Sequence, residues 1–158
     1  MDEARTAYRL ERGSTGFRSF GDPPVPDTDP GLCRTAWYAA ARAARGQVLD
    51  FTGMEHPQTF HTATLADRNG THIALFHAHH PLIAFVDAQH SWYPCDAFLD
   101  PPAWAPALAD FGFTLLTTSQ LSLPLRAADT SALTAGEWKH IEHWRPDTVG
   151  EVLFNSWD

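Results

Sequence analysis

Residues 60–87 read FHTATLADRNGTHIALFHAHHPLIAFVD, and this stretch decides the fold. Three apolar-rich runs are separated by turn-forming residues, and Asn69-Gly70 between the first two is the strongest short-range signal of a β-hairpin. The third run, from Leu82, is continuously apolar, which is typical of a strand covered on both faces. Pro81 cannot donate a hydrogen bond to a strand ladder, so we expect it at an edge or in a turn. The stretch therefore predicts a three-stranded antiparallel meander.

Helix signals flank this meander on both sides. Asp29 before a proline is typical of an N-cap, and the Ala-rich run that follows is expected to end at Gly46. Asp100 before two prolines predicts another helix start, and Thr134 and Thr148 each precede a Glu by three residues, as in a capping box. The predicted strands span about 58–66, 71–78, 82–88 and 113–117, and the predicted helices span about 30–45, 101–111, 135–144 and 149–156. This pattern predicts the α+β fold class, with an antiparallel meander packed by helices.

The length of the chain fits one domain. A chain of 158 residues buries roughly 70% of its unfolded surface, which is enough for a core of its own. No internal repeat or change of composition divides residues 1–158, so we expect a single domain. Residues 13–30 are rich in Gly, Pro and Asp, and we expect them to form an extended arm or loop.

The chain is acidic, with 11 Lys and Arg residues against 19 Asp and Glu residues and a formal net charge of −8 when His is neutral. Nucleic-acid binding depends largely on clustered basic side chains, and the sequence has no such cluster, so we expect no nucleic-acid partner. The sequence shows neither a secretory signal pattern nor an apolar run of about 18 residues. These features predict a cytoplasmic protein that does not bind a membrane.

Histidine is the compositional outlier, because nine residues are His and five of them lie in the predicted meander. His77 and His79 are two positions apart, so on one strand they would face the same way, as two ligands of a metal ion do. The position of His61 depends on the hairpin. A two-residue Asn69-Gly70 loop sends His61 to the other face, whereas a three-residue loop with a glycine bulge places it opposite His77.

In the second of these registers, His61, His77 and His79 form a three-imidazole cluster that would hold a divalent metal ion. His77 and His79 are then also candidate catalytic residues. No glycine pattern of a nucleotide-binding site is present, so this metal ion is the one cofactor that the sequence suggests. The alternative, which the sequence leaves open, is that these histidines are structural or exposed side chains.

A second group of candidates lies in the loop after the third predicted strand. Trp92 and Tyr93 are amphipathic aromatic residues close to His90, and such side chains dominate binding hot spots, so we expect these three to contact a partner or ligand. Cys95 in the same loop is a candidate nucleophile, although no motif of a known cysteine enzyme surrounds it. Cys33 and Cys95 form no CxxC pair, so both are otherwise expected to be reduced packing residues.

Two functions fit these observations. The first is a small acidic binding protein that acts through a protein partner, as an immunity or antitoxin protein does, because an acidic surface speeds association with a basic partner. The second is a small metal- or His-dependent enzyme that acts on a small molecule at the His61, His77 and His79 cluster. A sheet-lined pocket that binds an apolar small molecule without chemistry is a third interpretation. We place the binding protein first, since the sequence contains no catalytic motif.

Overall fold

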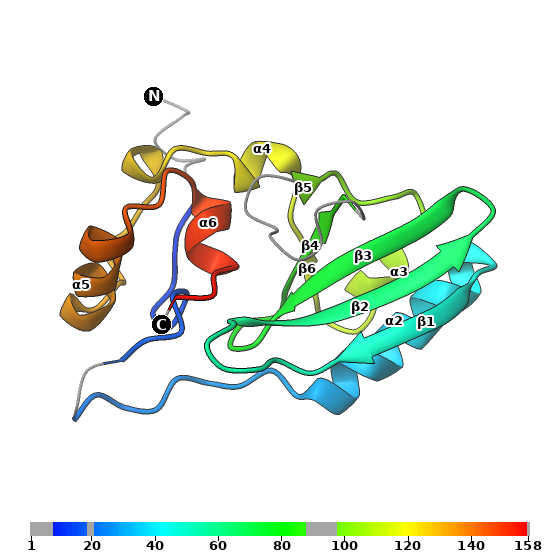
Figure 1. Cartoon of the computed structure of the whole chain (residues 1–158), viewed down its shortest axis with the longest axis horizontal. Helices are drawn as coiled ribbons and strands as arrows, with labels where there is room; N and C mark the ends of the chain where they lie inside the picture. Colours follow the sequence, from blue (N-terminus) through cyan, green and yellow to red (C-terminus); the bar gives the residue numbers. More distant parts are fainter. Residues whose placement is uncertain (1–7, 19–20, 88–97, 158) are drawn as a thin grey trace.

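The structure is a computed structural model, and it describes residues 8–18, 21–87 and 98–157. The elements in chain order are α2 (Pro30–Ala44), β1 (Gln47–Thr52), β2 (Phe60–Asp67), β3 (Gly70–His77), β4 (Leu82–Val86), β5 (Phe98–Leu99), α3 (Pro106–Ala109), β6 (Thr114–Leu115), α4 (Thr118–Leu121), the 3-10 helix η3 (Leu125–Ala127), α5 (Ala135–Trp144) and α6 (Val149–Leu153). Figure 1 shows a mainly antiparallel sheet with helices around it, which confirms the predicted α+β class. None of the helices in these ranges is long and apolar enough to cross a membrane.

The predicted meander is present as β2, β3 and β4, at the centre of a sheet with the strand order β1-β2-β3-β4-β5. The turn between β2 and β3 differs from both predicted loops, because Asp67 pairs with Gly70 and the loop is Arg68 and Asn69 alone. The Asp67 carboxylate accepts a hydrogen bond from the Asn69 N–H at 2.8 Å, and Gly70 has a φ of +122°. A side chain that caps its own turn therefore sets a register that neither prediction contained.

The strands at the two edges of the sheet differ from the prediction. β1 was not predicted; it pairs antiparallel with β2, and a register shift between Val48 and Asp50 interrupts the ladder. The predicted strand 113–117 is present only as the two residues of β6, which pair with β4 in parallel. The prediction of a fourth antiparallel strand there is wrong, because β5 takes the antiparallel place on that edge of β4 and leaves only its first residues for β6.

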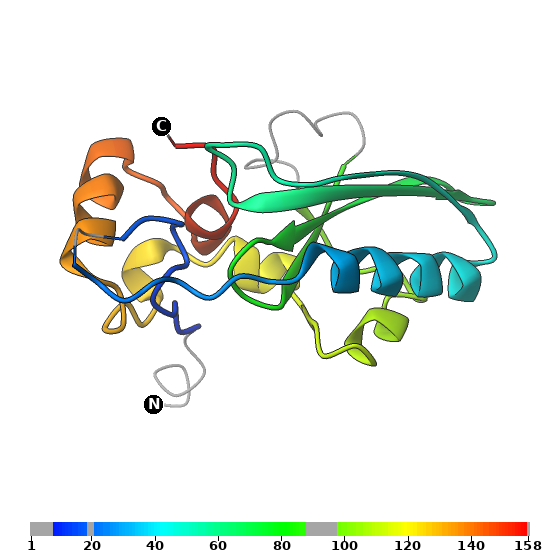
Figure 2. The same cartoon turned by 90° about the horizontal axis from the view of Figure 1, so that it is seen from below.

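One face of the sheet is covered by α2 and α3 (Figure 2). Asp29 caps α2, as predicted, because its carboxylate accepts a hydrogen bond from a backbone N–H of the first turn at 3.0 Å. Trp37 on α2 packs its ring against Phe76 and Phe85 of the sheet. Cys33 is buried in the same core, and burial raises the pKa of its thiol to about 12, so Cys33 is a packing residue with a free thiol.

The end of α2 corrects the prediction that Gly46 stops the helix. The C-cap is Arg45, which adopts the left-handed conformation with a φ of 56°. Gly46 serves a close approach instead, because a Cβ at this position would lie 2.4 Å from the carbonyl oxygen of Ala66. A glycine is therefore needed where the chain passes β2.

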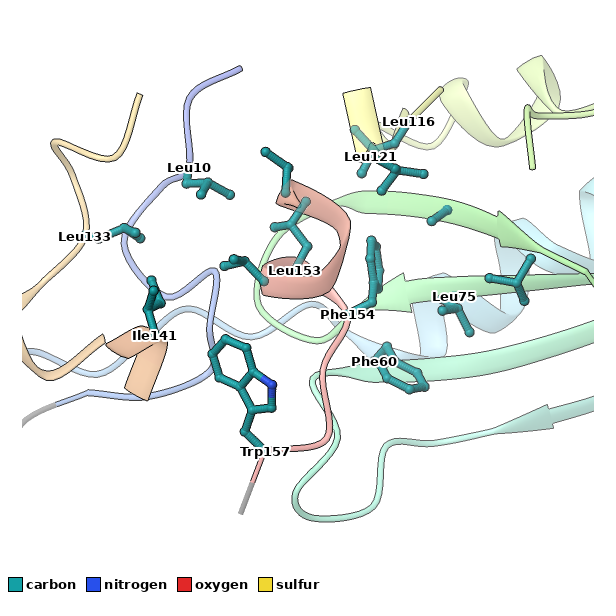
Figure 3. Close-up of a cluster of buried hydrophobic side chains, with 14 of the residues drawn as sticks. Leu10, Phe60, Leu75, Leu116, Leu121, Leu133, Ile141, Leu153, Phe154 and Trp157 are labelled. Carbon is teal, nitrogen blue, oxygen red and sulfur yellow. The ribbon is translucent and has the colours of Figure 1, made fainter. Parts of the chain in front are cut away.

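A second hydrophobic core lies on the other face of the sheet and extends past the end of its strands (Figure 3). Phe60 and Leu75 of the sheet belong to it together with Ile141 of α5 and Phe154, which follows α6. Leu10, from the segment before the predicted arm, is fully buried in the same core. The beginning and the end of the described chain therefore share one core with the sheet.

The two C-terminal helices follow the predicted capping signals to different extents. α5 spans the predicted 135–144, and its capping box is complete, with reciprocal hydrogen bonds between Thr134 and Glu137. α6 ends at Leu153, so the predicted helix 149–156 is too long. The chain leaves the helix there, and the residues that follow pack against the sheet.

The predicted helix 101–111 is also wrong in length, because only the four residues of α3 are helical. Asp100 does not cap it. Its carboxylate accepts hydrogen bonds from Thr118 at the start of α4 instead. α4 was not predicted, although Thr117 and Gln120 form a capping box there.

The segment predicted as an arm, 13–30, is extended only in its second half. Its first residues form turns, with positive φ at Gly13 and Gly16, and the residues between Gly21 and α2 belong to neither a helix nor a strand. We call the described residues of 12–29 the arm. The arm runs from beside α5 to the start of α2 (Figures 1 and 2).

Candidate functional site

The histidine at the end of β3 is bound by backbone groups on both ring nitrogens. His77 is fully buried, its Nε2 lies 3.0 Å from the Ser14 carbonyl oxygen, and its Nδ1 accepts hydrogen bonds from the N–H groups of His79 and His80, both at 3.1 Å. A neutral ring with its proton on Nε2 satisfies all three contacts. Burial lowers the pKa of His77 to about 3, so the ring stays neutral at physiological pH.

The next two histidines of this turn contact the arm as well. His80 Nε2 lies 2.9 Å from the Arg12 carbonyl oxygen. His79 Nδ1 lies 3.0 Å from the Pro26 carbonyl oxygen and 3.2 Å from a carboxylate oxygen of Asp27. The contacts of His77 and His79, the candidate catalytic residues, therefore describe a structural role, in which they fasten the arm to the turn after β3.

His61 does not join these histidines as the metal prediction requires. It pairs with Phe76, so it lies on the α2 face of the sheet, whereas His77 lies on the opposite face. His79 lies beyond the last residue of β3, so it does not share a strand face with His77. Within 8–18, 21–87 and 98–157, no group of three or more His, Cys, Asp or Glu side chains could hold a metal ion. The structure does not bring the three predicted ligands together.

A separate pocket of about 350 Å³ lies where β3 begins and β4 pairs with β5. Ile73, Phe85 and Val86 line it and are buried, the first and last in the core on one face of the sheet and Phe85 in the core on the other, so they give it an apolar floor where the two cores meet the sheet. Leu99 lines it too but is 47% exposed, which places an apolar side chain at the rim. A pocket of this size holds one or two amino-acid side chains, and its apolar floor favours a ligand with an aliphatic part.

Two carboxylates line the polar side of this pocket, namely Asp87 and Asp100. Thr118 donates two hydrogen bonds to one carboxylate oxygen of Asp100, from its N–H at 2.8 Å and from its hydroxyl at 3.0 Å. These hydrogen bonds hold the pKa of Asp100 below its usual value, so this carboxylate is ionised at neutral pH. The pocket therefore combines an apolar floor with negative charge.

His72 also lines the pocket, and Asp67 orients it. His72 Nε2 lies 3.0 Å from a carboxylate oxygen of Asp67, and the imidazole packs edge-on against Trp104 with 5.2 Å between ring centroids. Burial raises the pKa of Asp67, but the hydrogen bonds from His72 and the Asn69 N–H lower it by more, so Asp67 is ionised. Asp67 is therefore a third carboxylate at this end of the sheet, and it is hydrogen-bonded to the His72 ring.

The loop with the predicted contact residues begins and ends at the pocket. Its flanking residues in the described chain are Asp87, which lines the pocket, and Phe98, which pairs with Val86 and precedes Leu99. The predicted residues that lie outside the described ranges are His90, Trp92, Tyr93 and Cys95. Their roles stay predictions.

The pocket as a whole is not visible in the sequence. Asp87 and Asp100 stand out there as carboxylates near His90 that could take part in acid/base chemistry, but Asp100 is accounted for as a helix cap. The available signal was Leu99, an apolar residue in a short segment with no helical or alternating pattern around it. Such a position is more often exposed than an apolar residue inside a periodic run.

Comparison with known proteins gives this chain no relative. No protein family, no curated protein and no solved structure matches it. The interpretation of its function rests on the geometry and charge of the site described above.

Proposed function

We propose that the protein binds a protein partner and that the pocket between β3, β4 and β5 takes a basic side chain of that partner. The observation that carries this proposal is the pocket in which the carboxylates of Asp87 and Asp100 adjoin an apolar floor. Lys and Arg have the complementary shape, since an aliphatic stem ends in a cationic group. The stem would lie on the floor and the cation between the carboxylates.

The charge of the whole chain supports the same kind of partner. A net charge of −8 attracts a basic protein and raises the rate of association, and charge complementarity then orients the two surfaces. Leu99 at the rim adds an apolar contact that excludes water from the ion pair. A small acidic protein of this kind would act by covering a basic surface, as immunity or antitoxin proteins do.

The chemistry of the pocket is tested by NMR titration of the 15N-labelled full chain. The probe is N-acetyl-arginine amide, and the citrulline analogue is its uncharged control. We expect the arginine probe to shift the amide signals of Thr71, Ile73 and Leu99, and we expect added salt to weaken this effect. Equal shifts with both probes, or shifts confined to other parts of the chain, would overturn the assignment of the pocket.

A matched pair of variants separates local charge from net charge. Asp100→Asn keeps an oxygen for the Thr118 hydrogen bonds but removes the charge, and we expect it to weaken binding of the arginine probe about two- to fivefold. Glu142→Gln changes the net charge equally on the exposed side of α5, away from the sheet (Figure 1). We expect Glu142→Gln to bind the probe as the wild type does, and equal weakening by both variants would contradict a specific pocket.

The protein nature of the partner is tested by capture from native lysate. We expect a stoichiometric protein to be retained by the wild type and by Glu142→Gln and to be lost with Leu99→Lys, which places a cation at the rim. If the wild type retains only a small cationic molecule, identified by mass spectrometry, the pocket is a small-molecule site and the proposed protein partner is wrong.

A further inference from the structure

Three of the contacts that hold the arm, all made by the turn after β3, share one chemistry. The carbonyl groups of Arg12, Ser14 and Pro26 each face an imidazole nitrogen at 2.9 to 3.0 Å. All three imidazoles come from residues 77–80, so one short turn contacts the arm near both of its ends. In each contact the imidazole N–H donates to a carbonyl, so the response of the contact to acid depends on the hydrogen bonds of the other ring nitrogen.

Two buried histidines act as acceptors of backbone hydrogen bonds. His77 Nδ1 accepts from two N–H groups, and His61 Nδ1 accepts from the Met54 N–H at 2.8 Å. His61 is 4% exposed, and its Nε2 finds no hydrogen-bond partner in the part of the chain that the structure describes. A proton on either Nδ1 would turn an acceptor into a donor that faces an N–H group. The closed arrangement therefore requires both rings to be neutral.

The charge around His77 also opposes proton uptake. The titratable groups whose charge acts on His77 are His61, from the other face of the sheet, and His79 and His80 of the turn. The segments packed around this turn also carry Arg12 and Asp27 of the arm and Glu137 of α5. Only Asp27 and Glu137 are acidic. Asp27 contacts His79, and the Glu137 carboxylate accepts hydrogen bonds from Gly13 and Thr15. Protonated histidines would therefore outnumber the nearby carboxylates.

We propose that the histidines of residues 77–80, together with His61, form an acid-sensitive clasp, from which the arm detaches on acidification while the sheet and α2 stay folded. The two cores support a partial opening of this kind. No described residue of the arm belongs to the core between α2 and the sheet, so that core remains intact when the arm leaves. The clasp is independent of the proposed pocket, which lies where β3 begins.

Hydrogen exchange of the full chain between pH 7.5 and 4.5, corrected for the intrinsic exchange rate, tests the clasp. The Thr28 N–H, which donates to the Ala78 carbonyl at 2.7 Å, reports on the arm, and the amides of β2 and β3 report on the sheet. One coupled proton raises the opening constant about tenfold per pH unit, so we expect about a hundredfold loss of protection at Thr28 between pH 6.5 and 4.5. The sheet amides are expected to keep their protection. The proposal would be overturned if the Thr28 amide and the sheet amides lost protection to the same extent, or if Thr28 lost none.

Variants of two histidines identify the source of the acid response. His77→Asn keeps an acceptor oxygen for the N–H groups of His79 and His80 but takes up no proton, so we expect it to release the arm at lower pH than the wild type, and protection of its sheet amides at pH 7.5 shows that it folds. His80→Gln can still donate to the Arg12 carbonyl through its amide and leaves His77 unchanged, so we expect it to release the arm at the same pH as the wild type. His80→Ala removes the donor, and we expect a loosened arm at every pH. If His77→Asn releases the arm at the same pH as the wild type, the histidine cluster does not control release and the proposal is wrong.

Discussion

Glu137 and His77 hold the same three residues of the chain through opposite hydrogen-bonding groups. The buried Glu137 carboxylate accepts from the N–H groups of Gly13 and Thr15 and from the Thr15 hydroxyl, while His77 Nε2 faces the Ser14 carbonyl. The N–H groups of Gly13 and Thr15 are thus satisfied by Glu137, and the Ser14 carbonyl by His77. Neither role could be predicted, because the partners lie far away in the sequence and only the capping box of Glu137 and the strand position of His77 were visible locally.

Replacement of Glu137 tests this arrangement at a single residue. Glu137→Gln places an amide NH2 among N–H donors, so we expect the free energy of unfolding to fall by about 2–4 kcal/mol in urea denaturation. Glu142→Gln on the exposed side of the same helix is the control and is expected to stay within about 0.5 kcal/mol of the wild type. A Glu137→Gln variant as stable as this control would contradict the anchoring role.

His77 also couples the stability of the fold to pH. Its pKa is about 3 in the folded chain and about 6.5 in the unfolded chain, so the unfolded chain takes up the proton first. Stability is therefore complete above pH 6.5 and falls below it by about 1.4 kcal/mol per pH unit, until the arm opens. Urea denaturation at pH 7.5, 6 and 5 measures this slope. We expect His77→Asn, which keeps an acceptor oxygen, to be less stable at pH 7.5 but to show a shallower fall, and an unchanged slope would rule out His77 as its source.

At the scale of elements, local signals predicted those segments whose ends are set by their own side chains. Asp29 begins α2 and Thr134 begins α5 as expected. The prediction of a helix over 101–111 is wrong because Trp104 lies before α3 and not on it. Trp104 is apolar because it packs on Trp37 and Phe85, and its spacing from the apolar residues of α3 only resembles a helical repeat.

The three predicted metal ligands lie apart for a related reason. One side-chain hydrogen bond from the Asn69 N–H to Asp67 closes the turn, and this contact sets the register of the hairpin. The register in turn sends His61 to the face opposite His77. The sequence pattern located both strands, but it cannot distinguish turns whose registers differ by a single residue. The proposed pocket was beyond prediction too, since three separate strands build it.

The passage from α2 to β1 gives a prediction at this scale. Gly46→Ala would place a Cβ against the Ala66 carbonyl oxygen, so we expect a loss of about 1–3 kcal/mol of unfolding free energy, measured by thermal or urea denaturation. Gly31→Ala, whose Cβ would meet only the Asp29 side chain at 3.4 Å or more, is the control and is expected to lose no stability. A wild-type melting temperature for Gly46→Ala would show that the close approach does not need glycine.

At the scale of the whole molecule, the acidic character depends on pH. Each histidine that takes up a proton makes the formal charge of −8 less negative, so charge-steered association should weaken toward pH 5. A tri-arginine peptide serves as the probe, and its affinity is measured by calorimetry between pH 8 and 5. We expect a steady decrease, and affinity that is flat over this range would remove long-range charge as a basis for partner choice.

The core that joins the first and last described residues also has a consequence for synthesis of the chain. Thr15 accepts a hydrogen bond from Asn155, 140 residues later, and Gly13 donates to Glu137 across 124 residues. The core between α2 and the sheet needs only residues 33–113, so it can close on a partly made chain. Leu10 cannot be buried in its own core until the residues of α6 have left the ribosome. During most of the synthesis of this chain the Leu10 side chain is therefore unburied and available to chaperones.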